Sequence, residues 1–232
     1  MHPVVKLTSG TLAVFSPIML TPDVMAKVNE LGGNVKYLVA PNVEHHIFLS
    51  EWAEMYPGAR LIGPEGLSQK YQKAQKEKFA NEPFGVVFEA KKKHAIAIDP
   101  DFDRDFAYEY IDAHRNKEIV FFYKPDNALI EADLLFNLPA TEQYSRVPDA
   151  QKYKKGFLIW LANIIWSTQG EALGAKRFIW YALSRKDRRS WDASIQSINK
   201  WNFKTVIPCH GDVIEQDGKA IFEKIFEWHL KI

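Results

Sequence analysis

The sequence predicts a layered α/β or α+β sandwich, and three observations favour this class. A β-rich block opens the 232-residue chain, helical segments are interleaved with strands, and one more strand and helix close it. Hydrophobic residues make up 47% of the chain and charged residues 25%, as in ordinary globular proteins. A chain of this length suits one domain of moderate size, which we expect to span residues 1–232.

Local patterns predict the elements of the first third of the chain. Ser9-Gly10 marks a hairpin turn inside the β-forming run 4–17. Thr21 as N-cap and Pro22 in the first turn begin a helix that two glycines end. Apolar residues at helical spacing predict another helix before Pro57-Gly58. The other elements expected here are strands over 35–41 and 59–64 and a Lys- and Gln-rich helix over 66–78.

The middle of the chain is again rich in β-formers, and helices follow it. Alternating or continuous apolar runs predict strands over 85–90, 94–99, 106–112, 118–125 and 128–136. Helical patterns rich in Trp, Tyr, Lys and Arg cover 156–166, 172–186 and 188–202. A last strand over 204–209 leads through a polar loop into a terminal helix over 219–232. Strands and helices therefore alternate to the end of the chain.

Charge and cysteine usage exclude several classes of function. The formal net charge is +1, which gives no general affinity for nucleic acid. Cys209 is the only cysteine, so the chain forms no internal disulfide and a cytoplasmic location fits. The first twenty residues lack the pattern of a signal peptide, and no apolar run is long enough to span a bilayer. We expect a soluble protein without stable membrane insertion.

Polar residues follow several of the predicted strands, where layered folds place their functional side chains. These residues are His45 and His46, Asp112 and His114, Asp133, and His210 and Asp212. Imidazoles with one carboxylate form a suitable ligand set for zinc, iron or manganese. The alternative is structural: a single histidine at a strand end is usually a hydrogen-bonded turn residue, and Asp133 could cap the next segment.

The order of these residues resembles that of the metallo-β-lactamase superfamily. The leading signature of that family is His-x-His-x-Asp-His after a strand. Laid on this chain with its last histidine at His46, the signature has Pro41 and Val43 at its first two histidines and His45 at its aspartate. The later elements match better, with His114 in a loop before a strand, "EADLLF" around Asp133 and "VIPCHGD" around His210. The chain resembles a divergent branch, a domain of unknown function, with a degenerate leading motif.

The resemblance implies a four-layer αββα sandwich in which residues 138–190 form a helical insertion or lid. It also implies a metal site on the loops, with ligands drawn from His45, His46, His114, Asp133 and His210. Because two of the family's histidines are replaced, we expect one divalent metal ion instead of two. The exchange of a carboxylate for the imidazole of His45 favours zinc, with iron or manganese as alternatives.

We therefore expect a hydrolase of a small ester, thioester or lactone that uses a metal-activated water. His45, Asp133 and His114 are the catalytic candidates, and Glu44, Asp212 and Tyr123 could support the ligands. The alternatives are a non-catalytic binding or scaffold protein and an iron-dependent redox enzyme. The expected partner is a small-molecule substrate, and the chain could form a homo-oligomer. Residues of segment 138–190 and its flank could line an apolar pocket or bind an acidic group: Trp160, Trp166, Phe178, Trp180, Tyr181, Arg177, Arg185, Arg188 and Arg189.

Overall fold

The computed structural model describes residues 2–74, 84–142, 145, 148 and 156–231. The chain divides into two compact units. The first unit comprises His2–Asp112 with Asn116–Ile119, and the second comprises Ala113–Arg115 with Val120–Ile232. Residues 113–115 therefore form a short excursion of the second unit inside the sequence of the first.

The first unit contains a five-stranded mixed sheet. Its strands are β1 (Val4–Lys6), β2 (Leu12–Phe15), β3 (Val35–Val39), β4 (Arg60–Pro64) and β5 (Val86–Phe88), in the order β1-β2-β3-β4-β5. β1 and β2 form the expected antiparallel hairpin, with Gly10 at a φ of 86° in its turn. The other neighbouring strands are parallel. Parallel strands need crossovers, and the predicted helices supply them.

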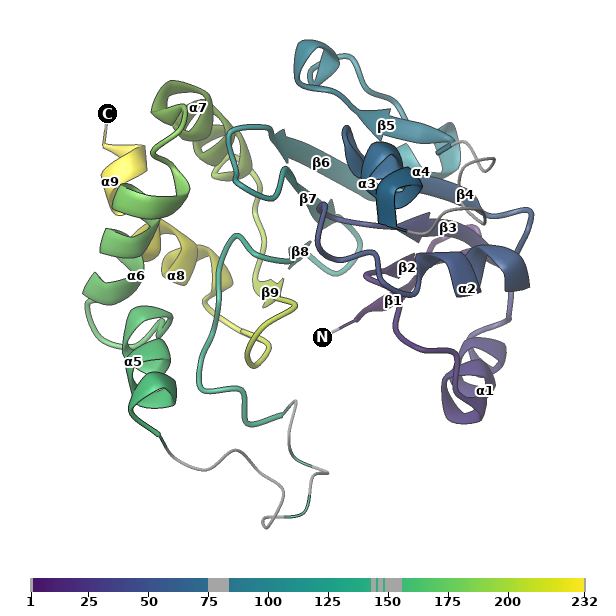
Figure 1. Ribbon diagram of the computed structural model, residues 1–232, viewed down its shortest axis with the longest axis horizontal. Coiled ribbons are helices and arrows are strands. Elements are labelled where there is room, and N and C mark those ends of the chain that lie inside the picture. Colours follow the sequence, from purple (N-terminus) through teal and green to yellow (C-terminus); the bar gives the residue numbers. More distant parts are fainter. Residues whose placement is uncertain (1, 75–83, 143–144, 146–147, 149–155, 232) are drawn as a thin grey trace. The chain divides into compact units, whose positions relative to one another are not determined.

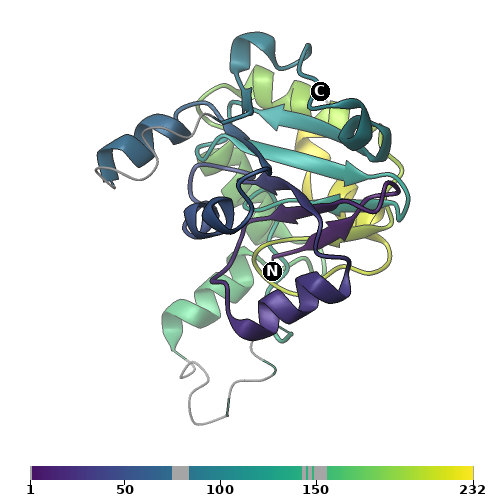
Figure 2. The ribbon, with the colours of Figure 1, turned by 90° about the vertical axis from the view of Figure 1, so that its right-hand side faces the viewer.

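Helices cover one face of this sheet. They are α1 (Pro22–Glu30), α2 (Leu49–Met55) and α3 (Leu67–Ala74). Val28 of α1 and Trp52 of α2 pack in one apolar cluster with Val14 and Leu38 of the sheet. Figure 1 and Figure 2 both show α1 and α2 beside these strands. The predicted cap of α1 is confirmed, because the Thr21 hydroxyl accepts a hydrogen bond from the amide of Val24.

The second sheet has four strands in the order β6-β7-β8-β9. These strands are β6 (Phe106–Ile111), β7 (Glu118–Tyr123), β8 (Ala128–Ile130) and β9 (Thr205–Ile207). The boundary between the units runs through β7. β8 is antiparallel to β7 and parallel to β9, so this sheet is also mixed. The loops that follow β8 and β9 carry Asp133 and His210.

Helices of the second unit come from the end of the chain. They are α5 (Phe157–Ile165), α6 (Leu173–Phe178), a π-helical segment η3 (Ile179–Leu183), α7 (Arg188–Ile198), α8 (Gly218–Ile225) and α9 (Glu227–Leu230). Phe222 of α8 packs against Phe226, which follows the helix directly. Phe222 also meets Phe203 edge to face. The terminal helix expected over 219–232 is thus divided into two helices.

Residues 94–106 differ from the expected secondary structure. The apolar alternation over 94–99 predicts a strand, but these residues form a turn and an extended segment. A short helix, α4 (Pro100–Asp105), follows, and a 3-10 turn, η1 (Ala90–Lys92), precedes them. The Asp99 carboxylate caps α4 by accepting hydrogen bonds from the amides of Asp101 and Phe102. An Asp-Pro pair is a helix-start signal, and it prevails here over a short apolar alternation.

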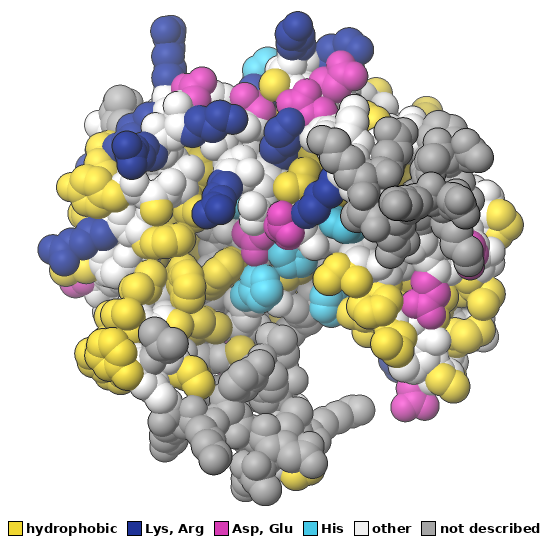
Figure 3. Space-filling view, in the orientation of Figure 1, with side chains coloured by type: hydrophobic (Ala, Val, Ile, Leu, Met, Phe, Trp, Pro, Cys, Tyr) yellow, Lys and Arg dark blue, Asp and Glu magenta, His cyan; other side chains and the backbone are white. Residues whose placement is uncertain are grey.

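The exposed surface of α5 is rich in large apolar side chains. Phe157 and Trp160 are 72% and 57% exposed, and Leu161 and Ile164 are exposed as well. Figure 3 shows apolar side chains gathered over α5 and α6. Nevertheless, among the described residues every helix is too short or too polar to cross a membrane.

An ion pair between a buried lysine and a partly exposed glutamate joins α6 to α9 in the second unit. The side chain of Lys176 is only 4% exposed, and its Nζ lies 2.7 Å from Glu227 Oε2. Lys231 also pairs with Glu227. Hydrogen bonds and charges from these two lysines lower the pKa of Glu227 to about 2. This pKa lies below the value of 4.5 for an unperturbed glutamate. The pair therefore stabilises the fold fully at pH values above about 4.5, and this stabilisation is lost as the pH falls towards 2.

We therefore expect Glu227→Gln to lower the free energy of unfolding at pH 7, because it leaves the ammonium of Lys176 buried without its carboxylate. Between pH 4.5 and 3 the wild type should lose stability faster than the variant. Urea denaturation across this range measures both effects. Glu215→Gln, at an exposed position of the same unit, is the control and should follow the wild type at every pH. Parallel pH curves for wild type and Glu227→Gln would contradict this account.

Candidate metal centre

In the first unit, the loop after β3 carries His45 and His46 and is organised by a buried asparagine. Asn42 is fully buried, and its Nδ2 donates a hydrogen bond to Glu118 Oε2 at 2.7 Å. This bond to a carboxylate defines which end of the Asn42 amide is the donor. Its Oδ1 accordingly accepts from the amides of Glu44 and His45 at 2.9 and 3.0 Å. The loop is thereby held in one conformation.

The same oxygen determines the protonation of the His45 ring. Nδ1 of His45 lies 2.9 Å from Asn42 Oδ1. Since that oxygen can only accept, Nδ1 must carry the proton, and the lone pair of the neutral ring lies on Nε2. A histidine that donates through one nitrogen to a fixed acceptor is the usual arrangement of a metal ligand. Asn42 is not among the functional residues predicted from the sequence, although an asparagine directly after a strand and a proline is a signal for such a loop.

His46 faces a different environment in the same loop. Its ring is half-buried, and burial together with the charge of Lys70 lowers its pKa. Lys70 also pairs with Glu44 at 2.9 Å and donates to the carbonyl of Val43 at 2.7 Å. Glu44, expected as a support for the ligands, thus has its carboxylate beside a lysine.

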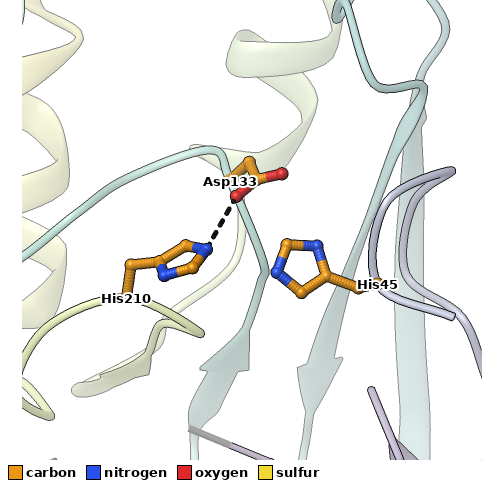
Figure 4. Close-up of side chains that lie close together, drawn as sticks. All are labelled: His45, Asp133 and His210. Carbon is orange, nitrogen blue, oxygen red and sulfur yellow. Dashed lines mark ion pairs between the residues drawn. The ribbon is translucent and has the colours of Figure 1, made fainter. Parts of the chain in front are cut away.

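In the second unit, Asp133 and His210 lie side by side. The distance from His210 Nε2 to Asp133 Oδ1 is 3.3 Å (Figure 4). The Asp133 side chain is largely buried, whereas that of His210 is about half exposed. Glu131 shapes the Asp133 loop, because its buried carboxylate accepts from the amides of Leu134 and Leu135.

The position of His210 depends on a close contact behind it. Asn137 donates its amide to the His210 carbonyl at 3.2 Å and bridges to Gly211. Gly211 has a φ of 103°, and a Cβ there would overlap the backbone of Asn137. Asp212 accepts from the amide of Glu142 at 2.7 Å and from Thr141. These contacts tie the loop after β9 to the loop after β8.

His114 belongs to the same unit and is tied to the Asp133 loop. Its side chain is buried and stacks on Trp191 with 5.5 Å between ring centroids. Burial lowers its pKa to about 4, although the Asp133 carboxylate and a hydrogen bond to the Asp133 backbone act in the opposite direction. The ring is therefore neutral at physiological pH. His114 contacts the loop of Asp133, which suits a residue that positions the carboxylate.

The remaining candidates from the sequence have other surroundings. Asp112 pairs with Lys93 at 2.6 Å, and Tyr123 is buried in β7. Trp166 and Phe178 meet edge to face. Trp180 lies beneath the guanidinium of Arg188, whereas Trp160 and Tyr181 are mostly exposed.

The donors present fit a divalent metal ion. Asp133 and His210 of the second unit offer one carboxylate and one imidazole, and His45 of the first unit is a further imidazole donor. Two ligands of one tetrahedral zinc, each about 2.0–2.1 Å from the ion, lie about 3.3 Å apart. The Asp133–His210 separation of 3.3 Å matches this value and exceeds the length of a charge-assisted hydrogen bond. This pair thus has the spacing of two ligands of one ion.

A family model described as "Domain of unknown function (DUF4336)" matches residues 2–155, which include His45 and Asp133. The chain belongs to the DUF4336 family. His210 lies beyond the matched part of this DUF4336 chain. No curated protein sequence matches it significantly.

Solved structures show the fold of this DUF4336 chain. The metal-soaked Flv1 flavodiiron core from Synechocystis sp. PCC6803 is 13% identical, with a TM-score of 0.58, over 97% of this chain and 51% of that one. The chain thus spans about half the length of that core. DIM-1 metallo-β-lactamase is 11% identical, with a TM-score of 0.57, over 99% and 86% of the two chains. At these identities the likeness shows the fold alone, and the expected α+β metallo-β-lactamase-like fold is confirmed.

We expect Asn42→Ala to destabilise the protein by about 2–4 kcal/mol, because it removes the acceptor of the loop amides and a donor to the buried carboxylate of Glu118. Asn42→Asp keeps the shape but places a second carboxylate against Glu118, so it should also destabilise. Chemical denaturation measures both variants. Asn202→Ala, at an exposed asparagine, is the control and should change stability by less than about 0.5 kcal/mol. If Asn42→Ala were as stable as the wild type, the hydrogen bond between Asn42 and Glu118 would not have the role assigned to it.

Gly211→Ala tests the close contact behind His210. The new Cβ would overlap Asn137, and the left-handed backbone adds strain, so we expect a loss of at least about 2 kcal/mol. The His210 ring resonances should shift in NMR spectra as the loop moves. At Gly58 an added Cβ meets no atom within 4 Å, and Gly58→Ala is the matched control. Equal effects of the two substitutions would argue against the contact.

Proposed function

We propose that His45, Asp133 and His210 hold one divalent metal ion and that the protein is a metal-dependent hydrolase. The tautomer of His45 carries this proposal, since the bond of Nδ1 to Asn42 directs the lone pair of the ring to Nε2. The 3.3 Å spacing of Asp133 and His210 supports it from the second unit. Three protein ligands with one open position are the usual composition of catalytic zinc sites.

The donor set favours zinc. Two neutral imidazoles and one carboxylate suit an ion of borderline softness, whereas magnesium and calcium prefer oxygen ligands. Iron and manganese accept the same donors and are the alternatives. When bound, such an ion lowers the pKa of a water molecule and polarises a carbonyl oxygen.

The neighbouring residues have supporting roles in this proposal. Asn42 holds His45 in the correct tautomer, and Glu131 shapes the loop of Asp133. His114 is neutral and buried, so it keeps its hydrogen bond to the Asp133 loop without adding positive charge beside the ligands. His46, with a lowered pKa, is a neutral base in the same loop as His45. We propose that the substrate is a small ester, thioester or lactone.

Two other functions lead to different metal contents. A binding or scaffold protein on the same fold would retain no metal. An iron-dependent redox enzyme on this fold, which a flavodiiron core shares, would retain iron. Elemental analysis of the purified protein therefore separates the three.

After expression in metal-supplemented medium, we expect about one equivalent of zinc per chain by mass spectrometry of the elements. His45→Ala, Asp133→Asn and His210→Ala should each remove most of this metal. Asn42→Ala should weaken its binding by about 10- to 100-fold, because it releases the His45 ring. His94→Ala, in an exposed segment, is the control and should retain the metal.

Each alternative outcome is informative. Less than about a tenth of an equivalent of any transition metal would reject the hydrolase and favour the binding protein. Iron with a visible absorption band, lost in the same three variants, would favour the redox enzyme. If the three variants retain zinc as well as His94→Ala does, the ion is bound elsewhere and the assignment of ligands is wrong.

A further inference from the structure

We propose that a pocket of the second unit binds the anionic group, a carboxylate or phosphate, of a small molecule. The pocket has a volume of about 460 Å³ and is lined by Ala113, Arg115, Ala182, Leu183, Arg185 and Lys186. This volume lies within the usual range of ligand sites. Half of the lining residues are cationic, and none is acidic.

The three cations of this pocket have no partner among the described residues. Arg115, Arg185 and Lys186 are exposed, and no hydrogen bond or ion pair joins their side chains to the part of the chain that the structure describes. Other basic residues of the same unit have partners: Lys176 pairs with Glu227, and Arg188 lies over Trp180. Three like charges around one pocket repel one another, and an anion relieves this repulsion.

The acidic residue next to Lys186 in the sequence has another role. Asp187 follows Lys186, but its carboxylate accepts a hydrogen bond from the amide of Ser190 at 3.0 Å and caps α7. It is not among the residues that line the pocket. The positive charge of the pocket therefore has no carboxylate within its wall to neutralise it.

The turn that carries Arg185 and Lys186 is held at both ends. Before it, the buried Ser184 hydroxyl donates to the carbonyls of Ile179 and Trp180 at 2.9 and 3.1 Å, which closes the π-helical segment. After it, the guanidinium of Arg188 lies 3.7 Å from the Trp180 ring centroid. π-helical turns are rare in proteins, and those that occur often lie at functional sites. The two arginines of the pocket, Arg115 and Arg185, offer planar donor pairs, which match the oxygens of carboxylate and phosphate.

The pocket adjoins the histidine loop of the same unit. Ala113 and Arg115, on one wall, flank His114, whose buried ring is bonded to the Asp133 backbone. In the proposed hydrolase the bound anion would be an acidic group of the substrate. That last step rests on the proposed function, whereas anion binding itself needs only the cations of the pocket.

Titration of the chelator-treated full chain with inorganic phosphate and with citrate, at low salt and followed by NMR, tests the proposal without any metal. We expect saturable shifts of the amides of Arg115, Arg185 and Lys186 with at least one of the two probes. Arg185→Gln and Arg115→Gln should each weaken binding by about tenfold or more, as expected for the loss of a charge-assisted hydrogen bond. Arg185→Lys should recover only part of the affinity, because it keeps the charge but loses the planar donor pair.

Arg177→Gln is the matched control, because Arg177 is an exposed arginine of the same unit outside the pocket. It should bind each probe within about twofold of the wild type. Saturation by phosphate alone indicates a phosphorylated ligand, and saturation by citrate alone indicates a carboxylate. Linear shifts with both probes, or an equal loss in Arg177→Gln, would overturn the proposal. Because the protein is free of metal, a failed metal assignment leaves this result unaffected.

Discussion

The buried hydrogen bond between Asn42 and Glu118 is the constraint on which the loop of His45 and His46 depends. Both side chains are fully buried, so each must find partners inside the protein. The carboxylate of Glu118 can only accept, which orients the amide of Asn42, and the amide in turn orients His45. The backbone reinforces this arrangement, because Ile119 donates to the carbonyl of Pro41 and Val43 donates to that of Asn116. Through two hydrogen bonds in series, the carboxylate of Glu118 thus determines which nitrogen of the His45 ring carries the proton.

A buried carboxylate also holds a loop of the second unit. Glu131 is buried and accepts two backbone amides from the loop that carries Asp133. On the loop after β9, Gly211 permits a contact with Asn137 that no side chain could allow. In the first unit a buried asparagine, and in the second a buried glutamate and one glycine, hold the loops that carry the proposed ligands. Such preorganisation is what a metal site needs, because its ligands must keep their positions while they are desolvated.

The replacement of two family histidines by Pro41 and Val43 has a physical consequence for the charge of the site. A centre with His45, Asp133 and His210 as ligands contains one negative charge against a divalent ion. The resulting complex has a net positive charge, which favours an anionic or polarisable substrate. The unpartnered cations around the pocket at Arg115 and Arg185 act in the same direction. If both proposals hold, they favour a substrate that carries an acidic group.

Local signals in the sequence determined most of the elements. The Thr21 cap, the Ser9-Gly10 turn and the polar residues at strand ends were read correctly, because each depends on a few neighbouring residues. The strand expected over 94–99 was wrong, since the Asp99-Pro100 signal starts a helix after an extended segment. The family resemblance predicted Asp133 and His210 as metal ligands, which stays a prediction, and implied the metallo-β-lactamase-like fold, which the solved structures confirm.

Tertiary structure alone decided the properties that give these residues their chemistry. The tautomer of His45 depends on Glu118, more than seventy positions away, and the place of His210 depends on Asn137. The neutral state of His114 follows from its burial against Trp191, and the cationic pocket forms only when Arg115 meets the turn after η3. The sequence by itself determined which residues could act and on which loops they lie. Proton positions, burial and the grouping of charges required the folded chain, because each is set by side chains that are distant in sequence.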